Sequence, residues 1–146
     1  MNDHDTSAAQ RYEISDDPTR LDAARIHHWL STDAYWALGR TREQQDRMIA
    51  GSLNFGVYDL SSGRQDAYAR VVTDRASFAW ICDVYVDRAA RGQGLGTRLV
   101  TTVRDELAPS GVRRFLLATK DAHGVYARLG FAPLTEPDMW MCLQAG

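Results

Sequence analysis

The stretch CDVYVDRAARGQGLGTRLV, residues 82–100, decides the fold that we expect for this chain. Its first letters end an apolar run, Phe78–Val86, in which Asp83 is the one charged residue. Such a run is typical of a central strand that is covered on both faces. A turn with glycines at positions 92, 94 and 96 follows, and apolar residues then recur at helical spacing until Pro109. The stretch therefore predicts a strand, a glycine turn and a helix in direct succession.

The residues before this stretch predict two helices and a hairpin. Asp17 followed by proline is typical of a helix N-cap, and Thr-x-x-Gln from Thr41 is a capping box. Two β-rich runs separated by a Ser-Ser-Gly turn indicate a hairpin. In chain order we expect a strand at 11–15, a helix from Asp17 to about Ser31, a helix from Thr41 to about Gly51, and strands at Leu53–Asp59 and Ala67–Thr73.

The residues after it predict a parallel strand, a short helix and a last strand. Phe115–Ala118 is a compact apolar run of the kind found in buried parallel strands. A short helix should follow and end at Gly130, and Met139–Leu143 reads as a final strand. We therefore expect an α/β fold with a mixed central sheet flanked by helices. The N-terminal strands should be antiparallel, and a β-α-β crossover should add a parallel pair.

Length and composition indicate one globular domain. The chain has 146 residues, of which 45% are hydrophobic and 25% charged. We expect residues 1–9 to be a disordered tail and residues 10–146 to form the domain. The net charge of -2 gives no reason to expect a nucleic acid partner. Cys82 and Cys142 lack metal-ligand spacing and read as reduced thiols, and consecutive His27 and His28 read as two sides of a helix rather than a metal site.

Two further features of the sequence bear on localisation. The first residues lack the basic start and apolar core of a signal peptide. The chain has no apolar run near the ~20 residues that cross a bilayer. We therefore expect a cytoplasmic protein with no membrane partner and no metal.

The glycine turn can hold a phosphate. Its glycines let successive N–H groups point into one space, and the following helix N-terminus and Arg91 add positive charge. A tight turn without a ligand is the alternative. A P-loop needs Lys and then Ser or Thr after its last glycine, whereas Gly96 is followed by Thr97 and Arg98. A dinucleotide-binding fold needs a glycine at position 97, so both of these phosphate loops fail on spacing.

The turn resembles the coenzyme A motif of the GNAT superfamily of N-acetyltransferases. That motif is Arg or Gln, two residues, Gly, one residue, and Gly or Ala, matched here by Arg91, Gly94 and Gly96. The stretch DAHGVYARLGF, residues 121–131, resembles the second signature of the family, with a tyrosine near the start of a helix that ends in Leu-Gly-Phe. The resemblance is strong from about Phe78 to Phe131 and rests on element order before that. Two features depart from the pattern. The proline often seen a few residues before the loop arginine is absent, and no glutamate lies on the preceding strand, where many relatives keep a general base.

The resemblance implies acetyl-coenzyme A as cosubstrate and an amine as acceptor. The backbone of Val84, Tyr85 and Val86 would bind the pantetheine arm, and one of these N–H groups would steady the oxyanion. The pyrophosphate would lie on Arg91, Gly92, Gln93, Gly94, Gly96 and Thr97.

Side-chain chemistry is expected from three residues. Tyr126 matches the tyrosine of the second signature, and a phenol with a pKa near 10 can donate a proton to the leaving thiolate. Asp83 is the candidate base, because it is a carboxylate in an apolar strand whose burial would raise its pKa. A hydrogen-bonded structural aspartate is the alternative. His123 is a rival base or a substrate contact, or else a helix cap or surface residue.

The acceptor is expected on the aromatic residues Trp29, Tyr35 and Trp36, unless these only pack in the core. Polyamines, aminoglycosides, amino acids and protein N-termini all stay open as acceptors. Many relatives pair through sheet edges or C-terminal strands, so the resemblance leaves a homodimer open. A non-catalytic coenzyme A-binding sensor with the same fold is the second reading, and an unrelated phosphate- or nucleotide-binding protein is the third.

Overall fold

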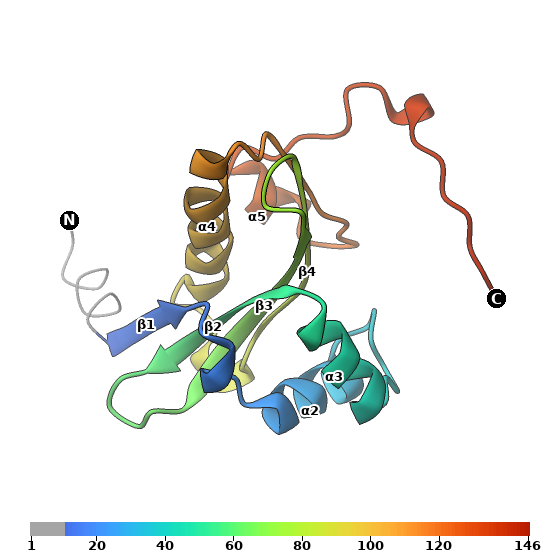
Figure 1. Cartoon of the computed structure of the whole chain (residues 1–146). Helices are drawn as coiled ribbons and strands as arrows, with labels where there is room; N and C mark the ends of the chain where they lie inside the picture. Colours follow the sequence, from blue (N-terminus) through green and yellow to red (C-terminus); the bar gives the residue numbers. More distant parts are fainter. Residues whose placement is uncertain (1–10) are drawn as a thin grey trace.

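A computed structural model describes residues 11–146 (Figure 1). Its five strands and four α-helices alternate with short 3-10 turns. The strands are β1 (Tyr12–Ser15), β2 (Leu53–Asp59), β3 (Gln65–Thr73), β4 (Phe78–Val86) and β5 (Arg114–Leu116). The helices are α2 (Ala23–Asp33), α3 (Arg42–Ala50), α4 (Leu95–Leu107) and α5 (His123–Ala127). The 3-10 turns are Pro18–Arg20, Arg88–Ala90, Ala108–Ser110 and Pro137–Met139. The expected tail at 1–9 lies outside the described residues.

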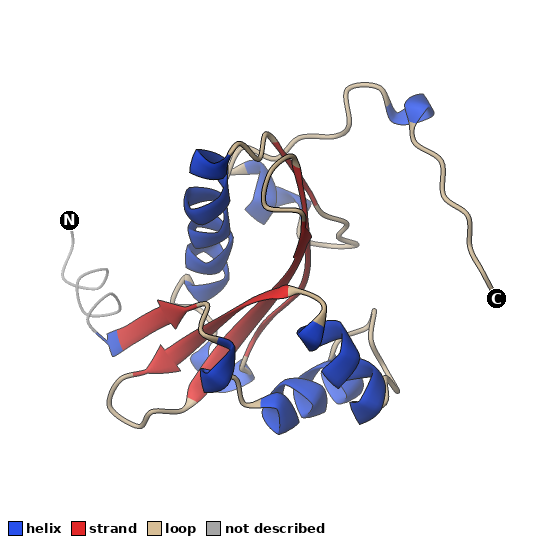
Figure 2. Cartoon of the chain, in the orientation of Figure 1, coloured by secondary structure: helices blue, strands red, loops and turns tan. Residues whose placement is uncertain are grey.

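The strands form one mixed sheet in the order β1-β2-β3-β4-β5. The first four pair antiparallel, and β4 pairs with β5 in parallel after the crossover through α4. Helix α4 covers one face of the sheet, and α2 and α3 cover the other (Figures 1 and 2). This arrangement confirms the predicted fold class.

Two apolar layers hold the helices to the sheet. On one face, buried residues of α4 such as Leu99 and Val103 pack on β2, β3 and β4. On the other face, Ile26 and Leu30 of α2 pack against Tyr68 and Tyr85. Both layers follow from sequence periodicity, because α4 has its apolar residues at helical spacing and the strands alternate.

Several local predictions are confirmed. Helix α3 begins after Thr41, whose Oγ1 accepts a hydrogen bond from the Gln44 N–H at 3.1 Å. The hairpin of β2 and β3 forms around Gly63, and β5 is parallel to β4 as expected. Phe115 and Leu116 of β5 are only half-buried and Arg114 is exposed, and all three border a cavity described below.

The predicted first helix is divided into two elements. Asp17 caps the 3-10 turn Pro18–Arg20 through its contact with the Thr19 N–H at 2.9 Å. Leu21 is then extended, and Asp22 accepts from the Arg25 N–H at 3.1 Å to open α2. A second capping aspartate so close to the first ends the 3-10 turn and starts a new helix.

The predicted strand at Met139–Leu143 is wrong. A 3-10 turn at Pro137–Met139 is followed by residues 140–146 without regular structure, and this segment leads away from the sheet in Figure 1. Met141 is 96% exposed and Leu143 is 91% exposed. A short apolar run forms a strand only where a sheet edge is within reach, and here the chain leads away from the sheet.

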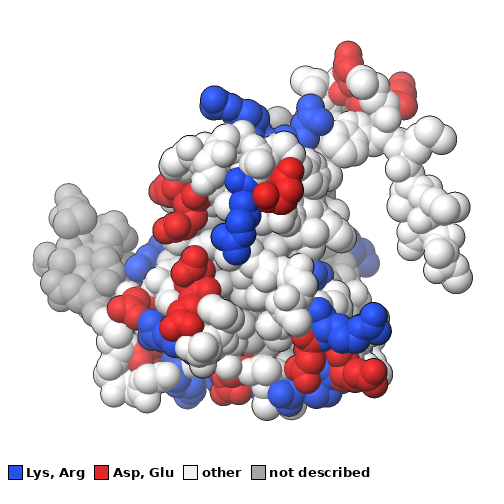
Figure 3. Space-filling model, viewed as in Figure 1, with Lys and Arg blue, Asp and Glu red and all other residues white. Residues whose placement is uncertain are grey.

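Charged side chains are mixed on the face of the molecule that Figure 3 shows. Acidic and basic residues are interspersed there, in keeping with a net charge of -2. On this face, the described residues form no continuous basic stripe of the kind that follows a nucleic acid backbone.

A β-bulge in β4 opens the sheet. Tyr68 and Arg70 of β3 lie opposite Tyr85 and Cys82, so two steps along β3 match three along β4. Asp83, inside this bulge, has a positive φ of 52°. Pairing with β5 is limited to Phe78–Trp80, before the bulge, so the last part of β4 parts from β5.

Candidate active site

The gap between the end of β4 and α5 contains a cavity of about 720 Å³. It is lined by the last residues of β4, the glycine turn, the start of α4, one side of α5 and the segment after α2. The end of β4 and both signatures found in the sequence, the glycine turn and the stretch at 121–131, therefore meet in one cleft.

The end of β4 presents a free strand edge to this cleft. Val84, Tyr85 and Val86 line the cavity, while the ladder with β5 ends at Trp80. On the opposite edge these residues stay paired with β3, through Tyr68↔Tyr85 and Ala67↔Val86. An extended ligand with amide groups can therefore bind along β4 in the place of a neighbouring strand.

The glycine turn is an open cradle. Gly92 and Gly94 have φ values of 83° and 77°, and a Cβ atom added at either would meet nothing within 4 Å. Gly94 is the N-cap of α4 and has no side chain that could cap the first N–H groups. These N–H groups and the helix dipole are therefore available to an anion. Gly96 and Thr97 line the same cavity, and Gln93 braces the turn by donating to the Ala90 carbonyl at 3.1 Å.

Arg91 lies beside the cradle, and Asp33 holds it there. The Arg91 Nε donates to the Val86 carbonyl at 2.9 Å, and its guanidinium lies 5.2 Å from the Tyr85 ring centroid. Asp33, at the end of α2, pairs with Arg91 at 3.5 Å and with Arg88. It also accepts the Tyr85 hydroxyl at 2.5 Å. Hydrogen bonds from Arg88 and Tyr85 hold the pKa of Asp33 well below its usual range.

Tyr126 lies in the wall between this cleft and a second cavity of about 900 Å³. Burial raises the pKa of Tyr126, and nearby Tyr35 and Asp121 raise it further. Its ring meets Phe131 edge-on, with centroids 5.9 Å apart. The phenol therefore keeps its proton at neutral pH and borders the same space as the cradle and the free edge of β4.

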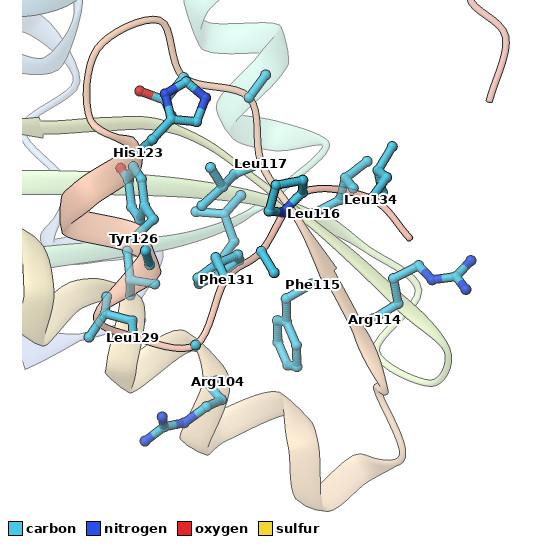
Figure 4. Close-up of a pocket in the computed structure, with 18 of the residues that line it drawn as sticks. Arg104, Arg114, Phe115, Leu116, Leu117, His123, Tyr126, Leu129, Phe131 and Leu134 are labelled. Carbon is cyan, nitrogen blue, oxygen red and sulfur yellow. The ribbon is translucent and has the colours of Figure 1, made fainter. Parts of the chain in front are cut away.

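The second cavity is mainly apolar, and Figure 4 shows its lining. Phe115, Leu116 and Leu117 come from β5 and the residue after it, and they line the cavity together with His123 and Tyr126 of α5. His123 borders this cavity and is not among the residues that line the cleft. The structure therefore brings Tyr126, but not His123, together with the predicted cofactor residues.

Two of the three aromatic residues predicted for the acceptor line the cleft. Tyr35 and Trp36 are 47% and 44% exposed, and their rings meet edge-on with centroids 5.0 Å apart. The Tyr35 hydroxyl accepts from the Lys120 N–H at 2.9 Å, which links the segment after α2 to the one before α5. Trp29 instead lies in the core, 5% exposed and stacked on Tyr85 at 5.3 Å.

Asp83 is buried in a cluster of donors. Its Oδ2 accepts from Arg40 at 2.9 Å and from Arg70 at 2.8 Å, and its Oδ1 accepts from the Trp36 indole N–H at 2.8 Å. Burial acts to raise the pKa of Asp83, but the hydrogen bonds from Arg40 and Arg70 outweigh it, and the pKa is lowered. The predicted rise in this pKa is therefore wrong, because burial brings the carboxylate next to two guanidinium groups that stabilise its charge.

Sequence reasoning missed Asp33, Arg40 and Arg70. Each lies far from its partner in the sequence, and an arginine inside a strand or after a helix carries no local signal of a buried pair. Within residues 11–146, no group of three or more His, Cys, Asp or Glu side chains could hold a metal ion. No helix in that range is long and apolar enough to cross a membrane.

The chain matches the model of the acetyltransferase (GNAT) family over residues 6–131. Among curated proteins, it is 29% identical to the thialysine N-epsilon-acetyltransferase of Mus musculus over 141 residues, covering 91% of this chain and 74% of the mouse protein. The Bos taurus protein of the same name is 26% identical and is covered to 75%.

Solved structures agree with this assignment. A protein from Xanthomonas campestris pv. campestris, described as belonging to the GNAT family, is 41% identical, with a TM-score of 0.85 over 92% of this chain and 93% of that one. The ribosomal-protein-S18-alanine N-acetyltransferase of Escherichia coli has the same fold, with a TM-score of 0.70 at 24% identity over 85% and 79% of the two chains.

Proposed function

The chain belongs to the GNAT family of acetyltransferases, and we propose that it transfers the acetyl group of acetyl-coenzyme A to a primary amine. The observation that carries the proposal is the cleft at the end of β4. An unpaired strand edge, an open glycine cradle at a helix N-terminus and a protonated phenol border one cavity. Each of these fits one part of the cosubstrate: the pantetheine amides, the pyrophosphate and the leaving sulfur.

The backbone does most of the binding in this proposal. Gly92, Gly94 and the first turn of α4 donate N–H groups to the pyrophosphate, and Arg91 adds its charge. The edge Val84–Val86 binds the pantetheine arm as a neighbouring strand would. An N–H group of this edge also stabilises the negative charge that develops on the thioester oxygen.

The transfer is a direct attack. The neutral amine nitrogen attacks the thioester carbonyl carbon, the new C–N bond forms, and the C–S bond breaks. Tyr126 gives its proton to the departing sulfur, and the amine loses a proton to solvent. The raised pKa of Tyr126 supports this role, because the phenol stays protonated at the pH at which it must donate.

The amine acceptor is proposed to enter beside Tyr35 and Trp36. These half-exposed rings line the same cleft as the glycine cradle and offer an apolar wall and a π face to an amine. The names of the mouse and bovine relatives suggest thialysine and lysine-like side-chain amines as the first acceptors to test.

The two candidate bases stay predictions. Both oxygens of Asp83 are already used by hydrogen bonds from Arg40, Arg70 and Trp36, which favours a different role for this residue. His123 borders the neighbouring cavity rather than the cleft. A neutral amine needs no strong base, so the proposal does not depend on either residue.

A thiol-release assay tests the proposed function. Acetyl-coenzyme A is incubated with the protein and a panel that contains thialysine, lysine, a polyamine, an aminoglycoside and a peptide N-terminus, and free thiol is followed. Amine-dependent thiol release is expected, with the acetylated product confirmed by mass. Tight binding of acetyl-coenzyme A without turnover on any amine would favour the non-catalytic sensor.

A further inference from the structure

We propose that Asp83 is a positioning residue of the acceptor site, which acts by holding Trp36 in place rather than by taking a proton from the amine. This inference rests on the proposed function for its acceptor. It assigns a task to a buried charged cluster, Asp83 with Arg40, Arg70 and Trp36, that the acetyl transfer itself does not use.

The bulge in β4 directs the Asp83 side chain toward the acceptor side. Ala79 and Ile81 before the bulge and Val84 and Val86 after it all pack in the α4 layer. The extra residue therefore lets Asp83 point to the other face, where the segment after α2 lies. Its φ of 52° is a left-handed conformation that aspartate tolerates better than most residues.

The cluster favours an anchor over a base. The Asp83 side chain is 1% exposed, and those of Arg40 and Arg70 are 11% and 9% exposed. With two guanidinium groups on one carboxylate, protonation of Asp83 would leave two buried cations without a counter-charge. Asp83 is also not among the residues that line the cleft, whereas Trp36 is.

One carboxylate holds both ends of the segment from Trp36 to Arg40. The indole N–H of Trp36 bonds Oδ1 and the guanidinium of Arg40 bonds Oδ2. Arg40 is fixed further by its bond to the Gln45 Oε1 at 3.0 Å. The exposed face of the indole therefore takes its orientation from Asp83, and the acceptor meets that face.

The first test removes only the indole N–H. In Trp36→Phe an aromatic ring remains but its bond to Asp83 is lost, so the KM for the amine should rise about three- to tenfold. The kcat and the KM for acetyl-coenzyme A should stay within about twofold, because the cradle and Tyr126 lie on other elements. Trp80→Phe is the matched control, since Trp80 is 43% exposed, lies on β4 with Asp83 and lines neither cavity. An unchanged amine KM in Trp36→Phe would overturn the proposal.

The second test separates an anchor from a base. If Asp83 takes the amine proton, Asp83→Asn should lower kcat about a hundred- to ten-thousandfold and remove the acidic limb of its pH profile. Under our proposal the pH profile keeps its shape and the amine KM rises. Adding Trp36→Phe to Asp83→Asn should then raise that KM little further, because the first change removes the contact that the second already disturbs.

Arg40→Met provides a variant that should fold. It leaves Asp83 paired with Arg70 as one anion and one cation, so no buried charge loses its partner. The segment after α2 loses one of its two anchors, and the amine KM should again rise while the KM for acetyl-coenzyme A stays unchanged. An amine KM in Arg40→Met equal to that of the wild type would also refute the positioning role.

A measurement without turnover keeps this inference separate from the proposed function. The chain has four tryptophans, and the indole N–H signal of Trp36 can be assigned in NMR spectra as the one that Trp36→Phe removes. Its exchange with solvent should be slow in the wild type and at least tenfold faster in Asp83→Asn or Arg40→Met, with the Trp80 signal unchanged. Protection of Trp36 without amine turnover would defeat the proposed function alone. Fast exchange of Trp36 in the wild type would defeat the positioning role alone.

Discussion

A pair of glycine substitutions tests the phosphate cradle directly. Gly94 and Gly63 have nearly the same left-handed backbone, with φ values of 77° and 75°, and a Cβ at either position meets nothing within 4 Å. Gly94 caps α4 in the cleft, whereas Gly63 lies in the turn of the β2–β3 hairpin. Valine at either site therefore strains the backbone equally, but only at position 94 does it place methyl groups where a pyrophosphate would bind.

The expected magnitudes follow from these geometries. A β-branched residue in the left-handed region costs about 1–2 kcal/mol, so both variants should lose a similar amount of unfolding free energy. For a domain of this size, each kcal/mol shifts Tm by roughly 2–4 °C. At a hundredfold excess of acetyl-coenzyme A over its Kd, the wild type and Gly63→Val should both gain about 2.7 kcal/mol. If Gly94→Val weakens binding a hundredfold, the same concentration should give it only about 0.4 kcal/mol.

Thermal melts with and without acetyl-coenzyme A measure both quantities. The wild-type Kd is first determined by titration, and all three proteins are then melted at the same ligand concentration. The expected result is a common loss of Tm without ligand and a ligand shift that is missing in Gly94→Val alone. A ligand shift in Gly94→Val as large as in Gly63→Val would refute the reasoning, because the cradle would then not contact the cosubstrate.

Other expected outcomes follow from single contacts. Tyr126→Phe should lower turnover, measured by thiol release, about a hundredfold. The Kd for acetyl-coenzyme A, measured by titration, should change less than twofold. Unchanged turnover would show that the phenol is not part of the mechanism. Wild-type kcat/KM with a lysine-like amine should keep rising up to about pH 10, because the amine must be neutral and the raised pKa keeps Tyr126 protonated. If kcat/KM begins to decrease before pH 9 while the protein is still folded, this expectation is wrong. Thr41→Ala should cost about 1 kcal/mol in denaturant unfolding by removing the cap of α3. Hydrogen bonds from Ser61, and then from Arg11, lower the pKa of Asp59 to about 2. The ionised carboxylate therefore stabilises the fold above about pH 4, and this contribution is lost as the pH falls toward 2. Acid unfolding of Asp59→Asn should lack this pH dependence.

The fold, and the meeting of the glycine turn with Tyr126 in one cleft, could be predicted because their signals are local. The glycine turn sits between an apolar strand and an amphipathic helix in one run, residues 82–100, and the structure keeps that order. Tyr126 follows in a second short motif, and the crossover brings both motifs to the same cleft. In each case the relevant neighbours lie within one element of each other, where periodicity and turn chemistry decide the conformation.

The Asp83 cluster could not be predicted from local signals. The register shift that defines the bulge depends on how β3 pairs with β4, and the residues near Asp83 do not indicate it. Arg40 and Arg70 reach Asp83 from the segment before α3 and from β3, so the sign of its pKa shift depended on contacts that only the fold creates. The final strand expected at Met139–Leu143 is absent for the same reason, because strand formation needs a sheet edge and not only a pattern.

The bulge at Asp83 links the two halves of the active site. After the bulge, Val84–Val86 are not paired with β5, and they leave the strand edge that we propose for the cosubstrate. At the bulge, the Asp83 carboxylate turns toward Trp36 and Arg40. Without the bulge, the side chains of β4 would alternate strictly between the two faces of the sheet. Asp83 would then follow Ala79 and Ile81 and face α4, and Val84 would face the opposite side. The charge of Asp83 would then be buried without its present partners, and β5 could continue to pair beyond Trp80. One extra residue therefore both opens the cofactor edge and places the acceptor wall, so shortening β4 by deleting Asp83 should abolish cosubstrate binding and amine recognition together.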